Sequence, residues 1–224
     1  MKRLITILAI FISAVAVAQN PIEKTIGEFS QLKVYDLINI ELIKSSENKI
    51  VISGKNASHV RINNKNGKLK IKMNLEKTFD GNQTKVKLYY TSVDIIDVNE
   101  GATVYSDDKI KQFEIDLKAQ EGGKIEVKLN VTYVNVKSVT GGVITTTGKA
   151  KQQKISLLTG GIYQGETLKT EKTNLIIKAA GEAHVNASKQ VDLKIRAGGD
   201  VNIYGNPEIV NESKVFGGRV KRMN

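Results

Sequence analysis

The sequence predicts an all-β protein folded as a parallel β-helix, a solenoid with coils of about 19 residues. Three observations support this prediction. Glycine-led tetrapeptides recur seven times at nearly constant spacing, apolar residues recur at fixed distances on both sides of each glycine, and the segments between them alternate apolar and polar residues. No segment shows the three- and four-residue apolar spacing of a helix. The period is too short for a strand-plus-helix repeat, so each repeat reads as one coil of short strands.

The glycines mark the corners of the coils. The first glycine of each tetrapeptide is Gly101, Gly122, Gly141, Gly160, Gly181, Gly198 or Gly217. Five positions before them stand Ile96, Leu117, Val136, Ile155, Ile176, Leu193 and Glu212, and three positions after them stand Val104, Ile125, Ile144, Tyr163, His184, Val201 and Val220. We interpret both columns as inward-facing. The first glycine is expected to need a positive φ or a close backbone approach, and the second glycine is only favoured.

The period is less clear between residues 27 and 90. Strands are expected at Phe29–Tyr35, Ile38–Ile43, Lys49–Ser53, Lys68–Met73 and Val86–Tyr90. The turn-like stretches INNKNGK (62–68) and DGNQ (80–83) separate some of them. We interpret this part as wider, irregular coils that close the N-terminal end of the same solenoid. An antiparallel sandwich is the alternative architecture, but it does not require apolar columns that recur at one phase.

The N-terminus has the pattern of an export signal. A basic start is followed by an apolar run and by the small-x-small pattern Ala16-Val-Ala18. We therefore divide the chain into a signal peptide (1–18), a short lead (19–26) and a single β-helical domain (27–223). No transmembrane segment is expected after cleavage, and the protein is expected in the periplasm, on the outer-membrane surface or in the medium. The chain has no cysteine, so disulfides play no part in its stability.

Several motifs resemble one known family. These are FSQLKVYDLINIELIKSSENKIVISG near the N-terminus, NGKLKIKM (66–73), the glycine-apolar coils and the closing VFGGRVKRM. Together they cover roughly residues 27–223 and are similar to the exported bacterial family named putative auto-transporter adhesin, head GIN domain. The chain departs from the family pattern at VYDLIN (34–39), where a small residue or glycine usually follows the valine. The resemblance implies a right-handed β-helix and an exported location, and it carries over no catalytic residue.

The sequence offers no catalytic, metal or cofactor motif. His184 is expected in the inward column and His59 at a strand start, and neither has a second His, Cys or paired carboxylate at a ligand spacing. The densest acidic stretch contains Asp94, Asp97, Glu100, Asp107, Asp108 and Asp116. A polysaccharide-active enzyme that uses this 94–116 region is the alternative to a non-catalytic protein.

The formal net charge of +11 points to an anionic partner. Four positions before the corners lies an outward column of Asp97, Lys118, Lys137, Ser156, Ile177 and Lys194. Its lysines Lys118, Lys137 and Lys194 form the candidate ligand-binding face, for an anionic glycan or another envelope component; the alternative is a solvated face that guards strand edges. Nucleic acid is not expected, because arginine is scarce and aromatic residues are not interleaved with the lysines. The preferred function is a non-catalytic, adhesin-like binding module, and a purely structural envelope protein is a further alternative.

Overall fold

The computed structural model describes residues 21–223, so the predicted signal peptide lies outside the described residues. The short N-terminal strands are β1 (Ile22–Thr25), β2 (Gln31–Val34), β3 (Asn39–Lys44), β4 (Lys49–Gly54), β5 (Val60–Lys65), β6 (Lys68–Met73), β7 (Thr84–Tyr90) and β8 (Ile95–Val98). Five long strands follow: β9 (Thr103–Gln120), β10 (Lys124–Val139), β11 (Val143–Leu158), β12 (Gly161–Ile177) and β13 (Gly181–Ala197). The last strands are β14 (Asp200–Tyr204), β15 (Ile209–Phe216) and β16 (Arg219–Arg222).

Two short 3₁₀ helices complete the secondary structure, η1 (Ala57–His59) and η2 (Leu75–Lys77). Within residues 21–223, no helix has the length and apolar character needed to cross a membrane.

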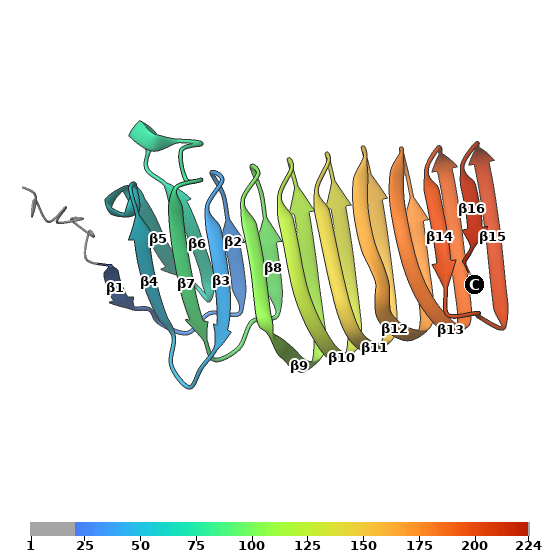
Figure 1. Ribbon diagram of the computed structural model, residues 1–224, viewed down its shortest axis with the longest axis horizontal. Coiled ribbons are helices and arrows are strands. Elements are labelled where there is room, and N and C mark those ends of the chain that lie inside the picture. The colour runs from blue at the N-terminus through green and yellow to red at the C-terminus, as the bar shows by residue number, and fades with distance from the viewer. Residues whose placement is uncertain (1–20, 224) are drawn as a thin grey trace, which may run out of the picture.

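The long strands form a stack of parallel coils, with narrow corners along one edge and broad bends along the opposite edge (Figure 1). Each long strand bends midway, so its first and second halves belong to two different ladders. Ladder A contains β1, β4, β7, β3, the first halves of β9–β13, β14 and β16, and ladder B contains β5, β6, β2, β8, the second halves of β9–β13, and β15. The stack makes about seven turns of about 19 residues each, which confirms the predicted solenoid.

The corner residues lie in one column, with one shift from the sequence-based alignment. The strand register places Gly101, Gly122, Gly141 and Gly160 one above another. At the next corner Tyr163 pairs with Ala183, so Ala180 occupies the corner position and Gly181 follows it. Ala180 has a φ of 41°, in the left-handed region that the corner requires. The expectation for Gly181 is therefore one residue out of register.

The same shift changes which residues face the core in this coil. Leu175 and Ala183 are buried where Ile176 and His184 are expected, while Ile176 and His184 face outward and are partly exposed. The cause is the length of the coil. The register of β11 against β12 shifts by one residue between Thr145 and Gly148, near the bend, so Leu157 pairs with Ile177 and the following corner falls at Ala180.

The two glycines of a corner are required for different reasons. Gly141 has a φ of 70°, and a Cβ there would meet nothing within 4 Å, so backbone conformation alone selects glycine. A Cβ on Gly142 would lie 2.4 Å from the carbonyl oxygen of Ala119 in the preceding coil. Gly123 and Gly161 approach the preceding coil in the same way. Close backbone packing thus favours glycine at the second position of these corners, as expected, and Ala102 shows that alanine can also occupy it.

The core between the ladders is largely apolar and contains a buried polar network around Tyr163. The fully buried Tyr163 donates its hydroxyl hydrogen to Gln153 Oε1 at 2.8 Å, and its oxygen lies 2.7 Å from Thr146 Oγ1. Gln153 in turn donates to Thr173 Oγ1 at 2.8 Å. Gly165 leaves room for the tyrosine ring, because a Cβ there would lie 2.5 Å from the ring. Burial raises the pKa of Tyr163, so its hydroxyl stays protonated and can donate.

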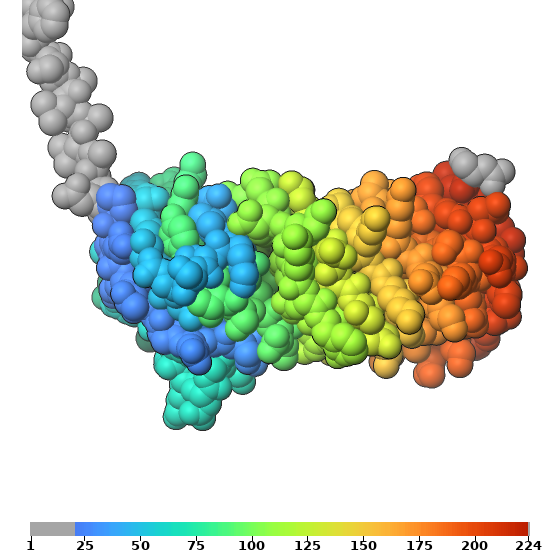
Figure 2. All heavy atoms as spheres, turned by 90° about the horizontal axis from the view of Figure 1, so that it is seen from below, coloured from blue at the N-terminus to red at the C-terminus, as the bar shows by residue number. Residues whose placement is uncertain are grey.

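The N-terminal coils do not stack in sequence order. β2 pairs with both β6 and β8, and β3 pairs with both β7 and β9, so the β2–β3 coil lies between the β6–β7 coil and the β8–β9 coil. β4 and β5 run antiparallel to β7 and β6 and cover the end, and β1, in the predicted lead, pairs with β4. Figure 2 shows blue and green segments interleaved at this end of the rod, whereas the colours run in order elsewhere.

One strand lies where the sequence indicates a turn. Residues 60–65 form β5, and the turn is limited to Asn66 and Gly67, whose φ angles of 52° and 71° make a tight hairpin. His59, expected at a strand start, lies in η1. The remaining strand expectations agree with β2, β3, β4, β6 and β7 to within a few residues.

At the C-terminal end, charged residues occupy inward positions. Glu212 pairs in register with Leu193, and Lys214 pairs with Ile195, both of which are core residues. Glu212 and Lys214 form an ion pair of 2.6 Å across the end of the core. Inward-pointing charges oppose the addition of a further coil, because that coil would bury them.

Candidate functional site

The outer face of ladder B carries two parallel rows of outward side chains, which we call the lysine row and the polar row. The strand register defines the lysine row as Lys118, Lys137, Ser156, Ile176, Lys194 and Ser213. The polar row contains Asp116, Asn135, Lys154, Asn174, Asp192 and Asn211. Neighbours within a row lie ~4.8 Å apart, and the rows are separated by two residues of strand, about 7 Å.

The structure brings two of the three predicted lysines together. Lys118 and Lys137 lie on adjacent coils, whereas Lys194 lies three coils beyond Lys137, about 14 Å along the axis at ~4.8 Å per coil. Lys118 forms an ion pair of 3.2 Å with Asp116. Ile176, and not Ile177, is the apolar member of the row, because Ile177 is fully buried.

Sequence reasoning missed the polar row, although its signal is present. Each member stands six positions before its corner residue, just as the lysine row stands four positions before. The members differ in type but share the ability to form hydrogen bonds: two carboxylates, three amides and one ammonium group. The side-chain amide of Asn135 donates to Asp116 Oδ1 at 2.8 Å, and that of Asn211 donates to Asp192 Oδ1 at 2.7 Å.

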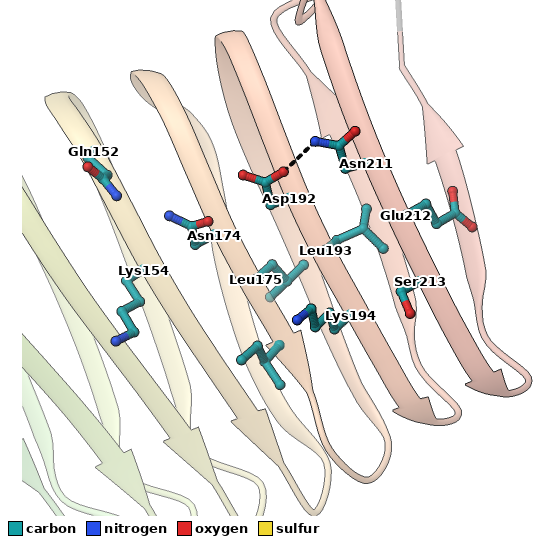
Figure 3. A pocket seen from close by; sticks show the side chains of 11 residues that line it. Gln152, Lys154, Asn174, Leu175, Asp192, Leu193, Lys194, Asn211, Glu212 and Ser213 are labelled. Atoms are coloured by element: carbon teal, nitrogen blue, oxygen red, sulfur yellow. Dashed lines mark hydrogen bonds between the residues drawn. The ribbon is translucent and has the colours of Figure 1, made fainter.

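Both rows run into a shallow hollow over β11, β12, β13 and β15, shown in Figure 3. The hollow has a volume of about 640 Å³. Outward side chains around it are Gln152, Lys154, Asn174, Ile176, Asp192, Lys194, Asn211 and Ser213. Of the predicted lysines, only Lys194 lines this hollow.

The charged groups of the hollow are held in defined states. Hydrogen bonds from Asn211 and then from Gln190 lower the pKa of Asp192, so this carboxylate stays ionised and accepts hydrogen bonds. Among residues 21–223, no carboxylate oxygen lies within 4 Å of the Nζ atom of Lys154 or Lys194. The hollow therefore offers two cations without a carboxylate partner beside two anions, Asp192 and Glu212, that are already engaged.

The outer face of ladder B is also basic at its N-terminal end. Lys70 and Lys33 precede Asp97 and Lys118 in the same register column. Partial burial disfavours the charge of Lys33, but its hydrogen bond and Coulomb attraction to Asp97, at 3.0 Å, outweigh this and raise its pKa. A hollow of about 360 Å³ lies over the β5–β6 hairpin, lined by Asn63, Lys65, Asn66, Lys68 and Lys70. The alternating lysines of KLKIKM are its signal in the sequence.

The acidic stretch 94–116 does not converge on one point. Asp97 binds Lys33 on the outer face of ladder B, while Asp107 pairs with Lys128 at 3.6 Å near the bend. Asp108 accepts a hydrogen bond from the backbone of Lys44, and Glu100 lies at a corner with a φ of 53°. These carboxylates are spread over a ladder face, a bend and a corner, too far apart to act together.

Asp94 and Asp116 share a hollow with Glu114. This hollow of about 490 Å³ is also lined by Ile95, Gln112 and Phe113. The amide of Asn135 donates to Glu114 Oε1 at 2.7 Å and to Asp116 Oδ1 at 2.8 Å, so both carboxylates accept from one donor. Phe113 is 66% exposed beside them. Its ring packs edge-on against Tyr133, with centroids 5.2 Å apart.

His184 lies on the outside of ladder A. Its Nε2 atom is 2.8 Å from Glu182 Oε1 and 3.4 Å from the side-chain amide of Asn202, and its ring stacks on Tyr204. These contacts tie neighbouring coils together. Within residues 21–223, no group of three or more His, Cys, Asp or Glu side chains is placed to hold a metal ion.

Comparison with solved structures finds the same architecture in other bacterial proteins. A putative adhesin from Bacteroides fragilis has 18% sequence identity and a TM-score of 0.83, covering 91% of this chain and 96% of that one. A putative adhesin from Parabacteroides distasonis has 15% identity and a TM-score of 0.71, covering 91% and 96%. A protein of the same species, described as a putative lipid binding protein, has 16% identity and a TM-score of 0.61, covering 92% and 98%. These likenesses show a shared fold.

A search of curated proteins finds no match. A family model, in contrast, matches residues 28–207, from the start of the first coil to the end of β14. That match includes both rows up to β13 and six of the seven corners. The chain therefore belongs to the family described as putative auto-transporter adhesin, head GIN domain.

Proposed function

We propose that the protein is a non-catalytic, exported binding module that holds an anionic glycan along the outer face of ladder B. The observation that carries this proposal is the pair of parallel rows, in which Lys137, Lys154 and Lys194 have no carboxylate partner among the described residues. Membership of an adhesin family supports a binding role.

The chemistry of the rows suits a linear sugar chain. Amide, carboxylate and ammonium groups repeat every ~4.8 Å along the axis and can bond hydroxyl groups of successive sugars. Ile176 adds an apolar spot between the polar groups, where the face of a sugar ring can rest. The rows contain four lysines and two aspartates, Lys118, Lys137, Lys154, Lys194, Asp116 and Asp192. This excess of positive charge favours glycans that carry carboxylate, phosphate or sulfate groups.

The proposal is tested with a variant that neutralises the free lysines of the rows. We expect Lys137→Gln, Lys154→Gln and Lys194→Gln together to lower the affinity for anionic glycans about tenfold or more, since each lysine contacts the chain directly. A glycan array read at low and high salt gives the measurement. The wild-type signal should weaken at high salt, because these charges are exposed.

The matched control neutralises three exposed lysines outside the two rows: Lys124 at the start of β10 in ladder A, and the register partners Lys149 and Lys169 near the bend. The net charge changes equally, so this control should retain binding. An equal loss in both variants would show that net charge alone attracts the glycan and would overturn the assignment of the face. Wild-type protein that binds no anionic glycan would favour a purely structural role.

One observation favours an enzyme as the second candidate. Both Glu114 and Asp116 accept a hydrogen bond from Asn135 Nδ2 and lie next to an exposed aromatic ring, on which a sugar ring could stack. If the protein cleaves a polysaccharide there, incubation should release oligosaccharides, and Glu114→Gln should abolish the release. Polysaccharide that stays intact after prolonged incubation would rule out the enzyme and leave binding as the remaining function.

A further inference from the structure

A projecting loop stands at the N-terminal end of the stack. The tip loop, residues 74–83, leaves β6 in ladder B and enters β7 in ladder A, at the place where other coils have a short corner. It rises beyond the line of corners in Figure 1, near the end that carries β4 and β7. Two large apolar side chains lie on it in solvent, Leu75 at 91% exposure and Phe79 at 58%.

The loop is held in shape by polar contacts, so the exposure of its apolar side chains is fixed. Asn74 Oδ1 accepts from the backbone of Lys77 at 3.1 Å, and the Nζ atom of Lys77 bonds Asp80 at 3.1 Å. The buried Asp36 accepts from the backbone of Phe79 at 3.2 Å. Phe79 has a φ of 59°, a backbone conformation that is unfavourable for a bulky residue. The surrounding contacts maintain this strain while its ring faces outward, which is typical of functional positions.

Cations flank the loop on both sides. Lys72 and its register partner Arg61 lie on the ladder B side, and Lys85 lies on the ladder A side. Lys55 lies next to Asn56, whose amide bonds the Asp80 carbonyl oxygen. The local charges are Lys55, Arg61, Lys72, Lys77 and Lys85 against Asp36, Glu76 and Asp80. The tip therefore combines two protruding apolar side chains with a positively charged surrounding.

We infer that the tip loop is a membrane-contact element, which inserts Leu75 and Phe79 into a lipid surface with acidic headgroups. Apolar side chains in the interface with cations at headgroup level are the signature of peripheral membrane binding. A protein partner fits less well, because protein interfaces have a contiguous apolar centre with few charges. Here the two apolar side chains are separated and surrounded by charge. The tip loop is distinct from the lysine and polar rows, so this inference does not depend on glycan binding.

The absence of tryptophan from the chain allows a direct test. Phe79→Trp introduces a single tryptophan at the tip, and Phe216→Trp in β15 provides a matched exposed control at the far end of the stack. With vesicles of mixed phosphatidylcholine and phosphatidylglycerol, we expect the emission of Phe79→Trp to shift to shorter wavelength. The emission of Phe216→Trp should stay unchanged. Vesicles of phosphatidylcholine alone should give a smaller shift, because the flanking cations then lack their partners.

Vesicle co-sedimentation of the otherwise unaltered protein measures the contribution of the tip. Leu75→Ser combined with Phe79→Asn should reduce binding to the mixed vesicles at least tenfold, and asparagine tolerates the left-handed backbone at position 79. Phe216→Ser is the control and should bind like the wild type. Equal emission of Phe79→Trp with and without acidic vesicles would overturn the inference. So would unchanged sedimentation of the double variant, or tip-dependent dimerisation without lipid, which would identify a second copy as the occupant.

Discussion

Replacement of Tyr163 by phenylalanine tests whether the buried polar network stabilises the solenoid. The substitution removes one hydroxyl group and leaves the ring, so it creates almost no cavity. Two hydrogen bonds are lost, the one to Gln153 at 2.8 Å and the one with Thr146 at 2.7 Å. Both partners are fully buried, so neither can turn to solvent for a replacement. The change therefore isolates the polar contribution of one atom.

The expected effect follows from these two losses. A buried hydrogen bond contributes about 1 kcal/mol net, and a buried polar group left without a partner costs about 1–3 kcal/mol. Gln153 keeps its Nε2 donation to Thr173, but its Oε1 atom loses the tyrosine hydroxyl as a donor. We expect the free energy of unfolding to fall by about 2–3 kcal/mol, and the melting temperature to fall by roughly 5–10 °C for a chain of this size.

Urea unfolding followed by circular dichroism gives the measurement, and Thr146→Val completes a double-mutant cycle. The coupling energy between the two substitutions should be about 1 kcal/mol, because each removes the same contact. Tyr133→Phe is the control, since that tyrosine faces outward, and it should change stability by less than about 0.5 kcal/mol. A Tyr163→Phe variant as stable as this control would refute the reasoning, because the network would then contribute nothing.

Two further predictions concern the corners. Gly141→Ala should lower the free energy of unfolding by about 1–2 kcal/mol because of the positive φ at this position, and Gly141→Asn should lower it by less. Gly142→Ala should lower it by about 3 kcal/mol or more, because the new Cβ meets a backbone carbonyl. Similar urea unfolding midpoints for Gly141→Ala and Gly142→Ala would contradict this distinction. Burial, followed by the nearby Asp36 charge, raises the pKa of Glu100. Ionised Glu100 therefore lowers stability at neutral pH, and Glu100→Gln should stabilise by less than about 1 kcal/mol at pH 7. This gain should shrink as pH falls through the raised pKa and vanish below about pH 4, where glutamate is protonated in both states; urea unfolding at both pH values checks the sign.

The solenoid was predictable because each coil contacts only its neighbours. The same local pattern therefore repeats once per coil in the sequence: glycine at the corner, and alternating apolar and polar residues along the strand. The inward columns before Gly101, Gly122, Gly141 and Gly160 agree with the structure for this reason. The rule fails at the pair Ala180-Gly181, where the sequence offers a glycine one position too late. Only the strand register shows that alanine takes the left-handed position there.

The candidate site was predictable only in part. Lys118, Lys137 and Lys194 share one row, as their common distance from the corners indicates. Which of these lysines forms an ion pair could not be predicted from their spacing, because the ion pair of Lys118 with Asp116 depends on side-chain geometry. The hollow likewise depends on how far neighbouring side chains extend from the sheet. The role inferred for the tip loop could not be predicted from the sequence either, because the sequence does not show whether two apolar residues in a loop are buried or exposed.

The sequence by itself determined the period, the corner chemistry and the alternation of inward and outward residues, because these depend on contacts within one coil and with the next. The tertiary structure alone decided the order of the N-terminal coils. β2 and β3 lie between coils that follow them in the chain, and β4 and β5 cover the end by antiparallel pairing. These strands pair because their edges and apolar faces are complementary in the folded protein. No repeated local pattern in the sequence specifies which distant strand a given strand pairs with.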